Sequence, residues 1–323
     1  DEGRRTKDEG RRTKDEGRME NYWFERSISE EALRLGFSFC GFARNESLEY
    51  LRSFYTDFIR RKGHAGFTYL ENFLEKRLNP DLVLKGTKSV IALLMNYYPA
   101  GIIPEEDNFI IAKYAYGNDY HWIMRQKMEM LVNFLEKSGR EVKAKTFVDS
   151  GAALEKVWAQ RCGVGWQGKN TLIINKTAGS FFFIGIIFTN LELIPDALET
   201  DHCGDCRRCV ETCPTGALNT PYQLDIRKCI SYYTVEKKEE TPDYLRGKFN
   251  NRIFGCDICQ DVCPYNRFAK PDNFPGFSPS SELLGMKKND WLHLTPEIFS
   301  RLFSGTAVER TGYLHFMKTI RAI

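Results

Sequence analysis

The sequence contains no run of about eighteen or more apolar residues, so no transmembrane helix is expected. Histidine is scarce, with five residues against ten cysteines, so thiolates dominate the possible metal ligands. Charge of one sign is not in excess either, because 46 Lys and Arg face 43 Asp and Glu, a net charge of +3. Composition alone therefore indicates neither a nucleic-acid-binding protein nor a membrane partner.

No stretch reads as a signal peptide, and a chain with this many thiols to keep reduced suits the cytoplasm. Residues 1–18 repeat the unit DEGRRTK twice and break off before Met19. The repeat has no apolar residue to bury, so we interpret it as an appended, disordered segment, with Met19 the expected natural start. With 42% hydrophobic residues, the chain suits one large or two to three smaller globular domains, and we expect a monomer.

Cysteine is abundant in one place, since eight of the ten lie between residues 203 and 263. The first four have the spacing C-x2-C-x2-C-x3-C-P, which is typical of ferredoxins that bind [4Fe–4S] clusters, and in which the fourth cysteine ligates the other cluster. A second run, C-x2-C-x3-C-P, lacks a nearby fourth cysteine, which Cys229 can supply. The spacing predicts two [4Fe–4S] clusters with crossed ligands, one held by Cys203, Cys206, Cys209 and Cys263 and the other by Cys213, Cys229, Cys256 and Cys259.

Two other interpretations of these cysteines stay open. Zinc sites usually present two separated C-x2-C pairs rather than a run of four that ends in proline. A disulfide framework needs an oxidising compartment and usually a short secreted chain. The spacing favours clusters over both. The remaining cysteines, Cys40 and Cys162, are expected to be buried structural thiols.

Ahead of the cysteine-rich stretch, apolar segments of strand length alternate with helical patterns. Strands are expected at about residues 37–43, 89–97, 109–114, 146–149, 171–175 and 180–189, and helices at about 19–35, 48–62, 120–138 and 151–162, with a further helix ending at 78. This alternation predicts an α/β layer fold. We expect an α/β domain over residues 19–200, a bacterial-type ferredoxin-like domain with two [4Fe–4S] clusters over 201–270, and a small helical segment over 271–323.

Two short motifs suggest cofactors but fail on their context. Residues 163–168 (GVGWQG) match GxGxxG, yet a helix precedes them and a strand follows, the reverse of a dinucleotide site. A loop at which the backbone approaches another large ligand is the preferred interpretation. Residues 119–121 (DYH) resemble the start of DxHxxG, in which histidine ligates the cobalt of a corrinoid, but Met124 stands where glycine is required. A polar loop that opens the long helix is expected there.

Asp149 follows an expected strand and precedes an expected helix. Ligands bind in α/β folds at the edge formed by the carboxyl ends of the strands. A carboxyl sheltered from water there could have a raised pKa and donate a proton. The alternative is that Asp149 caps the helix that follows.

Several linked motifs resemble those of the epoxyqueuosine reductase family from about Met19 to Arg267. They are Glu75-Lys-Arg77-Leu-Asn-Pro80, Gly117-Asn-Asp119-Tyr120-His121, Val148-Asp149-Ser150-Gly151, Gly165-Trp-Gln-Gly168-Lys169-Asn170, Cys213-Pro-Thr-Gly-Ala-Leu218, Cys229-Ile-Ser-Tyr-Tyr-Thr234 and Asn251-Arg-Ile-Phe-Gly-Cys256-Asp-Ile-Cys259-Gln260. The resemblance implies reduction of epoxyqueuosine to queuosine at the wobble position of tRNA. It also implies a cobalamin-binding α/β domain, with cobalamin as the reactive centre and the two clusters as electron relay.

The resemblance also implies roles for single residues. Asp149 matches the proton donor, and Lys237 matches a tRNA contact. Lys156 stands where some members carry arginine, which removes any guanidinium-specific role there. The cobalamin pocket would be formed by Arg77, Ala112, Asp149, Ile173, Ile184, Ile230, Asp257 and Ile258.

The partners that follow are tRNA carrying epoxyqueuosine and an external low-potential electron donor. About 60 residues follow Pro264, too few for the helical-repeat tail of some members, so the short form is expected. Two alternatives remain: a corrinoid enzyme similar to reductive dehalogenases, and a ferredoxin-type electron-transfer protein. The former usually carry an export signal.

Overall fold

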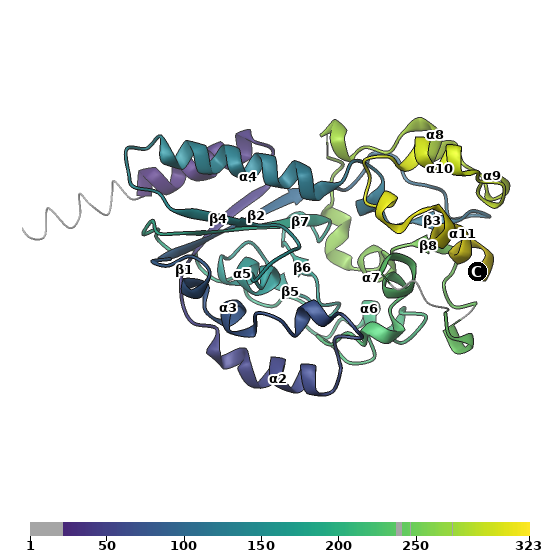
Figure 1. Ribbon diagram of the computed structural model, residues 1–323, viewed down its shortest axis with the longest axis horizontal. Coiled ribbons are helices and arrows are strands. Elements are labelled where there is room, and N and C mark those ends of the chain that lie inside the picture. The colour runs from purple at the N-terminus through teal and green to yellow at the C-terminus, as the bar shows by residue number, and fades with distance from the viewer. Residues whose placement is uncertain (1–21, 237–240, 246, 273) are drawn as a thin grey trace, which may run out of the picture.

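The fold is built around an antiparallel sheet of four strands in the order β1-β2-β7-β4 (Figure 1). The computed structural model describes residues 22–236, 241–245, 247–272 and 274–323. The strands are β1 (Phe39–Arg44), β2 (Ser89–Asn96), β7 (Phe182–Thr189) and β4 (Ala144–Phe147). The prediction of a mixed α/β fold is confirmed, but the sheet is antiparallel, so the rule for parallel strand ends does not place its ligand site.

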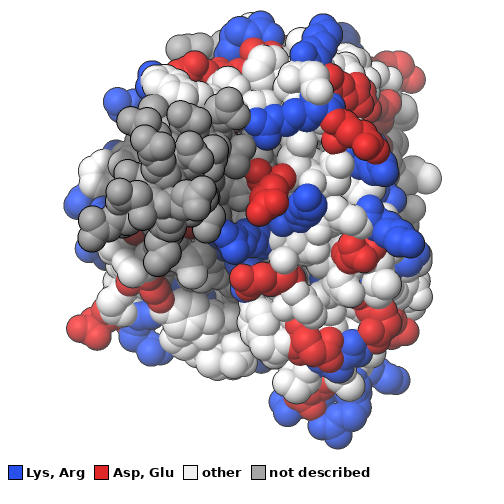
Figure 2. Space-filling view, turned by 90° about the vertical axis from the view of Figure 1, so that its left-hand side faces the viewer, with Lys and Arg blue, Asp and Glu red and all other residues white. Residues whose placement is uncertain are grey.

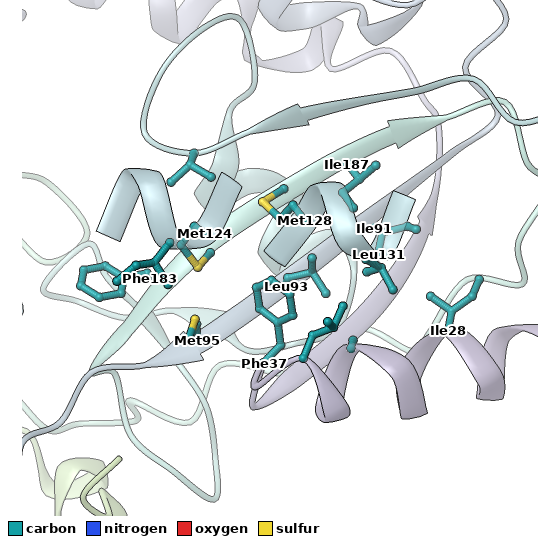
Figure 3. Packing of buried hydrophobic residues seen from close by; sticks show 14 of the residues in the cluster. Ile28, Phe37, Ile91, Leu93, Met95, Met124, Met128, Leu131, Phe183 and Ile187 are labelled. Atoms are coloured by element: carbon teal, nitrogen blue, oxygen red, sulfur yellow. The ribbon is translucent and has the colours of Figure 1, made fainter. Parts of the chain in front are cut away.

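Strand β2 shows how the sheet is buried on both faces. Alternate side chains of a strand point to opposite faces. Ile91, Leu93 and Met95 pack into one cluster with helix α4 (Tyr120–Glu136) and the helix of residues 22–34 (Figure 3). Val90, Ala92 and Leu94 pack on the other face, against helix α5 (Glu155–Arg161) with Trp158. A continuous apolar run is the pattern expected of a strand covered by helices on both sides.

Short elements on the α5 face differ from their predicted ranges. The expected helix at 48–62 is a 3₁₀ turn η1 (Glu49–Leu51) followed by α2 (Arg52–Arg60), which has no buried residue. Helix α3 (Leu74–Leu78) buries Arg77 and Leu78. Between them lies η2 (Thr68–Leu70), and η3 (Pro80–Leu82) follows. Helix α5 begins four residues later than the expected residue 151, because the chain first makes a turn at Asp149 and Gly151.

The glycine-rich segment 163–168 approaches its own chain closely. It contains β5 (Trp166–Gln167), which pairs with β6 (Ile173–Ile174) in a small hairpin. A Cβ atom on Gly165 would lie 2.4 Å from the carbonyl oxygen of Ile174, so no side chain fits. Packing of the hairpin accounts for the close approach at Gly165, and the expected approach of a large ligand to this loop stays a prediction.

The cysteine-rich stretch folds into short helices and turns at one side of the sheet, as Figure 1 shows around α6 and α7. Its elements are α6 (Arg208–Glu211), η5 (Ile226–Lys228), the π-helix η6 (Tyr232–Glu236), η7 (Asp243–Leu245), β8 (Arg252–Phe254), α7 (Ile258–Asp261) and η8 (Pro264–Phe268). Strand β8 pairs in parallel with β3 (Ile110–Ile111), which precedes η4 (Lys113–Ala115). The cysteine-rich stretch is thus joined to the first half of the chain by a sheet pairing.

The C-terminal helices cover the β3–β8 pair (Figure 1). They are α8 (Ser281–Gly285), α9 (Lys288–Leu292), α10 (Pro296–Phe303) and α11 (Tyr313–Ala322), with η9 (Pro275–Phe277) before them and η10 (Glu309–Thr311) before α11. Ile111 and Phe254 share one buried cluster with Trp291, Phe303 and Phe316. The packing therefore crosses the predicted boundaries at 200 and 270.

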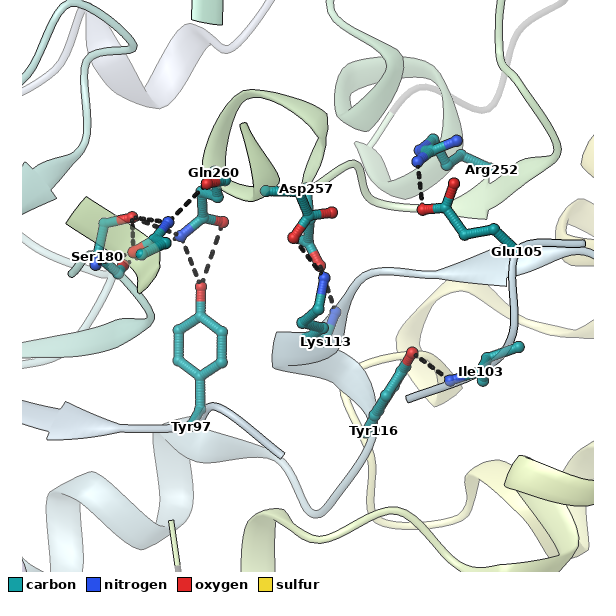
Figure 4. A network of polar contacts seen from close by, with 11 residues as sticks. Tyr97, Ile103, Glu105, Lys113, Tyr116, Ser180, Arg252, Asp257 and Gln260 are labelled. Carbon is teal, nitrogen blue, oxygen red and sulfur yellow. Dashed lines mark hydrogen bonds and ion pairs between the residues drawn. The ribbon is translucent and has the colours of Figure 1, made fainter. Parts of the chain in front are cut away.

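A buried polar network also joins these parts (Figure 4). The backbone N–H of Lys113 donates to Asp257 at 2.7 Å, and its Nζ lies 2.6 Å from Asp261. Nearby, the Gln260 amide donates to Tyr97 Oη at 3.2 Å and to the Ser180 carbonyl at 3.0 Å. Such contacts fix α7 against the sheet, because each buried polar group would be costly to leave unpaired.

The molecular surface carries mixed charge. On the face shown in Figure 2, Lys and Arg alternate with Asp and Glu and form no single large patch. Among the described residues, no helix is long and apolar enough to cross a membrane.

Candidate active site

Asp149 lies in a turn just after β4. Its φ of +50° is unusual for a residue other than glycine, and Gly151 follows with φ of +93°. This turn directs the carboxyl away from the sheet, and the side chain is 63% exposed. The residue that caps α5 is Leu154, and no side chain bonds to that end of the helix. The interpretation of Asp149 as a helix cap is therefore wrong.

The first turn of α4 meets this carboxylate. Asp119 caps the helix by accepting a hydrogen bond from the backbone N–H of His121, which confirms the predicted polar loop opening a long helix. Tyr120, the first residue of α4, donates a hydrogen bond from its Oη to Asp149 Oδ2 at 2.6 Å. The imidazole bridges two carboxylates, with Nδ1 of His121 2.6 Å from Asp119 Oδ1 and Nε2 3.6 Å from Asp149 Oδ2. Tyr120 is held by stacking on Phe183, at 4.1 Å between ring centroids.

These contacts shift the pKa values of Asp149 and His121. Partial loss of solvent around Asp149 in the cavity acts to raise its pKa, but hydrogen bonding to His121 and Tyr120 outweighs this effect and lowers the pKa below its ordinary value. The expectation of a raised pKa at Asp149 is therefore wrong. In return, the hydrogen bond to Asp149 raises the pKa of His121, so the contact favours a proton on the imidazole over one on the carboxylate.

Asp149 projects into a wide central cavity made of two adjoining hollows of about 500 and 680 Å³. The hollows share Asp149 and four further side chains, His121, Arg125, Glu236 and Arg310. Arg310, from η10, pairs with Glu236 of η6 at 2.8 Å. The cavity walls thus come from the sheet region, the cysteine-rich stretch and the C-terminal helices.

A second carboxyl and a lysine line the same cavity from the start of α5. Glu155 has its Oε1 buried without a hydrogen-bond partner. Burial, with the negative charge of Asp149 nearby, raises the pKa of Glu155 to about 8. Lys156 is exposed to the cavity, and the surrounding protein lowers its pKa.

The eight cysteines of the ferredoxin spacing line two further cavities, four in each, and all are free of disulfide bonds. The outer cysteine cavity is lined by Cys203, Cys206, Cys209 and Cys263. The inner cysteine cavity is lined by Cys213, Cys229, Cys256 and Cys259. The inner cavity adjoins the central one, since Lys156, Tyr97 and Tyr114 line both, and it shares Asn170 with the outer one. The three cavities therefore follow one another from the outer cysteines to Asp149.

The residues expected to touch cobalamin fall into two groups. Arg77 lines the central cavity with Asp149, and Ile230, Asp257 and Ile258 line the inner cysteine cavity next to it. Three others lie outside these cavities in packed surroundings: Ala112 beside Gly255, Ile173 in β6 and Ile184 in β7. Lys237 lies outside the described residues.

Sequence reasoning missed several side chains of this site. Tyr120 and His121 were treated only as a loop, although the segment 119–121 contains the polar residues that meet Asp149. Arg125 follows His121 by four residues, so it lies on the same helix face, a signal that could have been used. Glu155 and Arg310 carry no such signal, because tertiary packing alone brings them to the cavity.

Comparison with known families identifies both halves of the site. Residues 77–150 match the family described as epoxyqueuosine reductase QueG, DUF1730, and residues 202–266 match a 4Fe–4S double cluster binding domain. The first match spans Arg77, Tyr120, His121 and Asp149, and the second spans the eight cysteines.

Curated relatives and solved structures agree with these matches. The chain is 42% identical to the epoxyqueuosine reductase of Cellulophaga algicola, over 91% of this chain and 95% of that one, and 33% identical to that of Escherichia coli, over 91% and 79%. It resembles the structure of epoxyqueuosine reductase from Streptococcus thermophilus with a TM-score of 0.82 at 30% identity, covering 92% of this chain and 79% of that one. It also resembles a crystal structure of epoxyqueuosine reductase with an epoxyqueuosine-modified tyrosine tRNA stem loop, with a TM-score of 0.81 at 30% identity, covering 93% of this chain and 80% of that one. The chain therefore belongs to the epoxyqueuosine reductase family.

Proposed function

We propose that this protein reduces epoxyqueuosine to queuosine in tRNA, with Asp149 as the group that delivers the proton. The observation that carries the proposal is the succession of three cavities, in which two sets of four cysteines lead to a wide site containing a hydrogen-bonded carboxylate. Family membership supplies the substrate. The reaction consumes two electrons and two protons for each epoxide oxygen released as water, so it requires both an electron path and a proton path.

The cysteine sets suit [4Fe–4S] clusters. Each cavity presents four free thiols from loops whose spacing is typical of such clusters. Within the described residues, no three His, Cys, Asp or Glu side chains converge on a single metal ion. We propose the crossed assignment, with Cys263 completing the outer cluster and Cys213 and Cys229 completing the inner one, because the two cavities divide the cysteines in this way.

The central cavity would suit cobalamin. Both ring nitrogens of the histidine that lines it, His121, already face carboxylates, Nδ1 toward Asp119 and Nε2 toward Asp149, so we assign His121 to the proton rather than to the metal. Arg77, together with Ile230, Asp257 and Ile258 on the adjoining wall, would hold the cofactor. Bound cobalamin supplies a strongly nucleophilic reduced metal centre for the epoxide carbon.

The residues of the chain would manage the proton. Opening of the epoxide leaves an alkoxide, which departs only after protonation. The proton held at His121 Nε2 can pass to Asp149 Oδ2, and Asp149, which projects into the cavity, can deliver it. Tyr120 fixes the accepting oxygen through its 2.6 Å hydrogen bond, and Asp119 stabilises the charged imidazole from behind. Lys156 and Arg125 would offer positive charge to the RNA backbone at the cavity.

We further propose that the protein acts as a monomer in the cytoplasm, with electrons from an external low-potential donor. The test is turnover of epoxyqueuosine-containing tRNA by protein reconstituted without oxygen. About eight irons per chain and one equivalent of corrinoid absorbance are expected. Irons without corrinoid and without turnover would leave an electron-transfer protein. Turnover of organohalides in place of the tRNA would favour the dehalogenase-like alternative.

A further inference from the structure

The outer cysteine cavity opens toward a second groove at the molecular surface. This entry groove, of about 550 Å³, has Cys263 in its wall and shares Arg208 and Arg267 with the outer cavity. Its apolar part is formed by Tyr98 and Phe181. The inner cavity, in contrast, adjoins the central cavity that contains Asp149. The entry groove therefore gives an external donor a surface approach to the outer set of cysteines on the Cys263 side.

The charge of the entry groove is positive. Arg208 and Arg267 are exposed, and neither forms an ion pair among the described residues. Arg267 instead lies 4.6 Å from the ring centroid of Phe268, which is 39% exposed. The carboxylate in the groove lining, Asp261, lies 2.6 Å from Lys113 Nζ, which is also 3.5 Å from Asp257. The two arginines of the lining therefore outnumber its one carboxylate.

We propose that the entry groove beside Cys263 docks an acidic one-electron carrier protein through Arg208 and Arg267. The inference rests on the proposed function, which requires an external donor, and it adds the place and the charge of that donor. The reduced carrier loses one electron, the oxidised outer cluster gains it, and no bond is made or broken. Two such deliveries balance each epoxide reduced. Exposed arginines of this kind accelerate association with an acidic partner, and this electrostatic attraction weakens as the salt concentration increases.

The entry groove suits a protein better than the RNA substrate. The modified base must reach the central cavity near Asp149, whereas the inner cysteine cavity lies between that site and the groove. An exposed aromatic ring beside unpaired arginines is also typical of protein interfaces, in which aromatic residues and arginine are enriched.

The test uses the holoenzyme and the double variant Arg208→Glu/Arg267→Glu, with reduced flavodoxin as the acidic carrier and dithionite as a chemical reductant. We expect the flavodoxin-driven rate of cluster reduction, followed by stopped-flow absorbance, to fall about tenfold or more at low salt. Binding of oxidised flavodoxin, measured by calorimetry, should weaken in parallel, and both effects should shrink at high salt. Affinity for tRNA should stay within about twofold of the parent, since the central cavity is untouched. Because both arginines also line the outer cysteine cavity, the rate of cluster reduction by dithionite is measured on the same variant, and the flavodoxin-driven rate should fall relative to it.

The matched control is Lys137→Glu/Lys145→Glu, which makes the same charge change at the opposite end of the molecule, near the end of α4 and in β4 (Figure 1). It should leave all four measurements within about twofold. Equal flavodoxin rates for the parent and the Arg208/Arg267 variant would overturn the proposal, as would weakened tRNA binding by that variant, which would assign the groove to RNA. If the double variant does not fold, the flavodoxin-driven rate of cluster reduction is measured for Arg267→Gln and, over a range of salt concentrations, for the parent. A parent rate that does not change with salt contradicts the proposal. Loss of dithionite-driven turnover in the parent itself would instead count against the proposed function.

Discussion

At the scale of single residues, the site centres on the Asp149 carboxylate and the His121 imidazole, whose Oδ2 and Nε2 atoms lie 3.6 Å apart. We expect Asp149→Asn to retain both cofactors and to lower the turnover of epoxyqueuosine tRNA by about 10²–10⁴-fold, because an amide cannot transfer the proton. Single-turnover kinetics with spectroscopic measurement of iron and corrinoid tests this. Asp107→Asn, at a carboxyl that is 88% exposed, is the control and should leave the rate unchanged. Loss of corrinoid from Asp149→Asn would show a structural role instead.

Glu155 gives a prediction about stability and pH. Burial and the charge of Asp149 raise the pKa of Glu155 to about 8, whereas an ordinary Glu in the unfolded chain has a pKa near 4.5. Between these values the folded state binds more protons than the unfolded state, so the free energy of unfolding falls as pH rises through this window. Glu155→Gln removes that dependence, so its melting temperature should exceed that of the parent increasingly toward pH 8.

Thermal unfolding of reconstituted protein from pH 5 to pH 9 measures the difference. Glu141→Gln replaces a carboxylate that is 81% exposed. Its curve of melting temperature against pH should be parallel to that of the parent. A Glu155→Gln curve that is also parallel to the parent would show that Glu155 is ionised in the folded state.

Spacing along the chain predicted how the eight cysteines divide between two cavities, four in each. The ligand role of each cysteine stays a prediction. The proton system is different, since Asp149 meets α4 from 29 residues away and Glu155 acquires its pKa from burial. The sequence can point to such residues, but the direction of their pKa shifts follows from the contacts.

At the scale of elements, the loops that carry the cysteines cross between the two cavities. We expect Cys213→Ala to damage the inner cluster and Cys263→Ala to damage the outer one, each lowering bound iron from about eight toward about four per chain. Electron paramagnetic resonance of the reduced variants distinguishes the two clusters. Cys162→Ala, at a buried thiol outside both cavities, serves as the control. Loss of the outer cluster signal from Cys213→Ala would reverse the assignment.

The pair formed by Lys113 and Asp257 fixes η4 against the start of α7. Burial acts against the charge on Lys113, but Asp257 and Asp261 outweigh it and raise the lysine pKa, so the pair is ionic. Lys113→Met leaves the buried carboxylate of Asp257 without a cation and should lower the free energy of unfolding by about 3–5 kcal/mol. Lys88→Met removes the exposed contact to Glu192 at 3.9 Å and should cost less than about 1 kcal/mol.

Urea unfolding of both lysine variants provides the comparison. An equal decrease in the free energy of unfolding for Lys113→Met and Lys88→Met would show that the pair of Lys113 and Asp257 is solvated. Addition of Asp257→Asn to Lys113→Met should recover part of the loss, because one uncompensated charge is then removed.

Elements were predictable where apolar patterns are long. Strands β2 and β7 and helix α4 lie close to their expected ranges. Strand β3 is shorter than expected and pairs with a strand from the cysteine-rich stretch. Helix α5 is shorter than expected because it begins only after the turn at Asp149 and Gly151. Antiparallel pairing could not be read from the sequence, since a strand buried on both faces has the same apolar run in either direction.

At the scale of the whole molecule, the C-terminal helices complete the fold around the ferredoxin-like part. Trp291 is fully buried in the cluster that also contains Phe254 of β8, and its indole N–H donates to Asn108 Oδ1 at 3.1 Å. Arg310 from the same region reaches the wall of the central cavity. A segment expected only as a small tail therefore supports both the cluster-bearing stretch and the active site.

This arrangement predicts that damage to the C-terminal packing reaches the cofactors. Trp291→Ala should lower the free energy of unfolding by about 3–5 kcal/mol, because it creates a large cavity and removes one of the two hydrogen bonds to the Asn108 oxygen, which keeps the bond from the Phe109 N–H. Release of the clusters and unfolding of the sheet should then occur in one transition, since β8 pairs with β3 beneath this tryptophan. Urea titration followed by cluster absorbance and by circular dichroism measures both. Trp122→Ala, at a tryptophan that is 63% exposed on α4, is the matched control and should cost less than about 1 kcal/mol. Two separate transitions for Trp291→Ala would mean that the C-terminal helices fold independently of the cluster-bearing stretch.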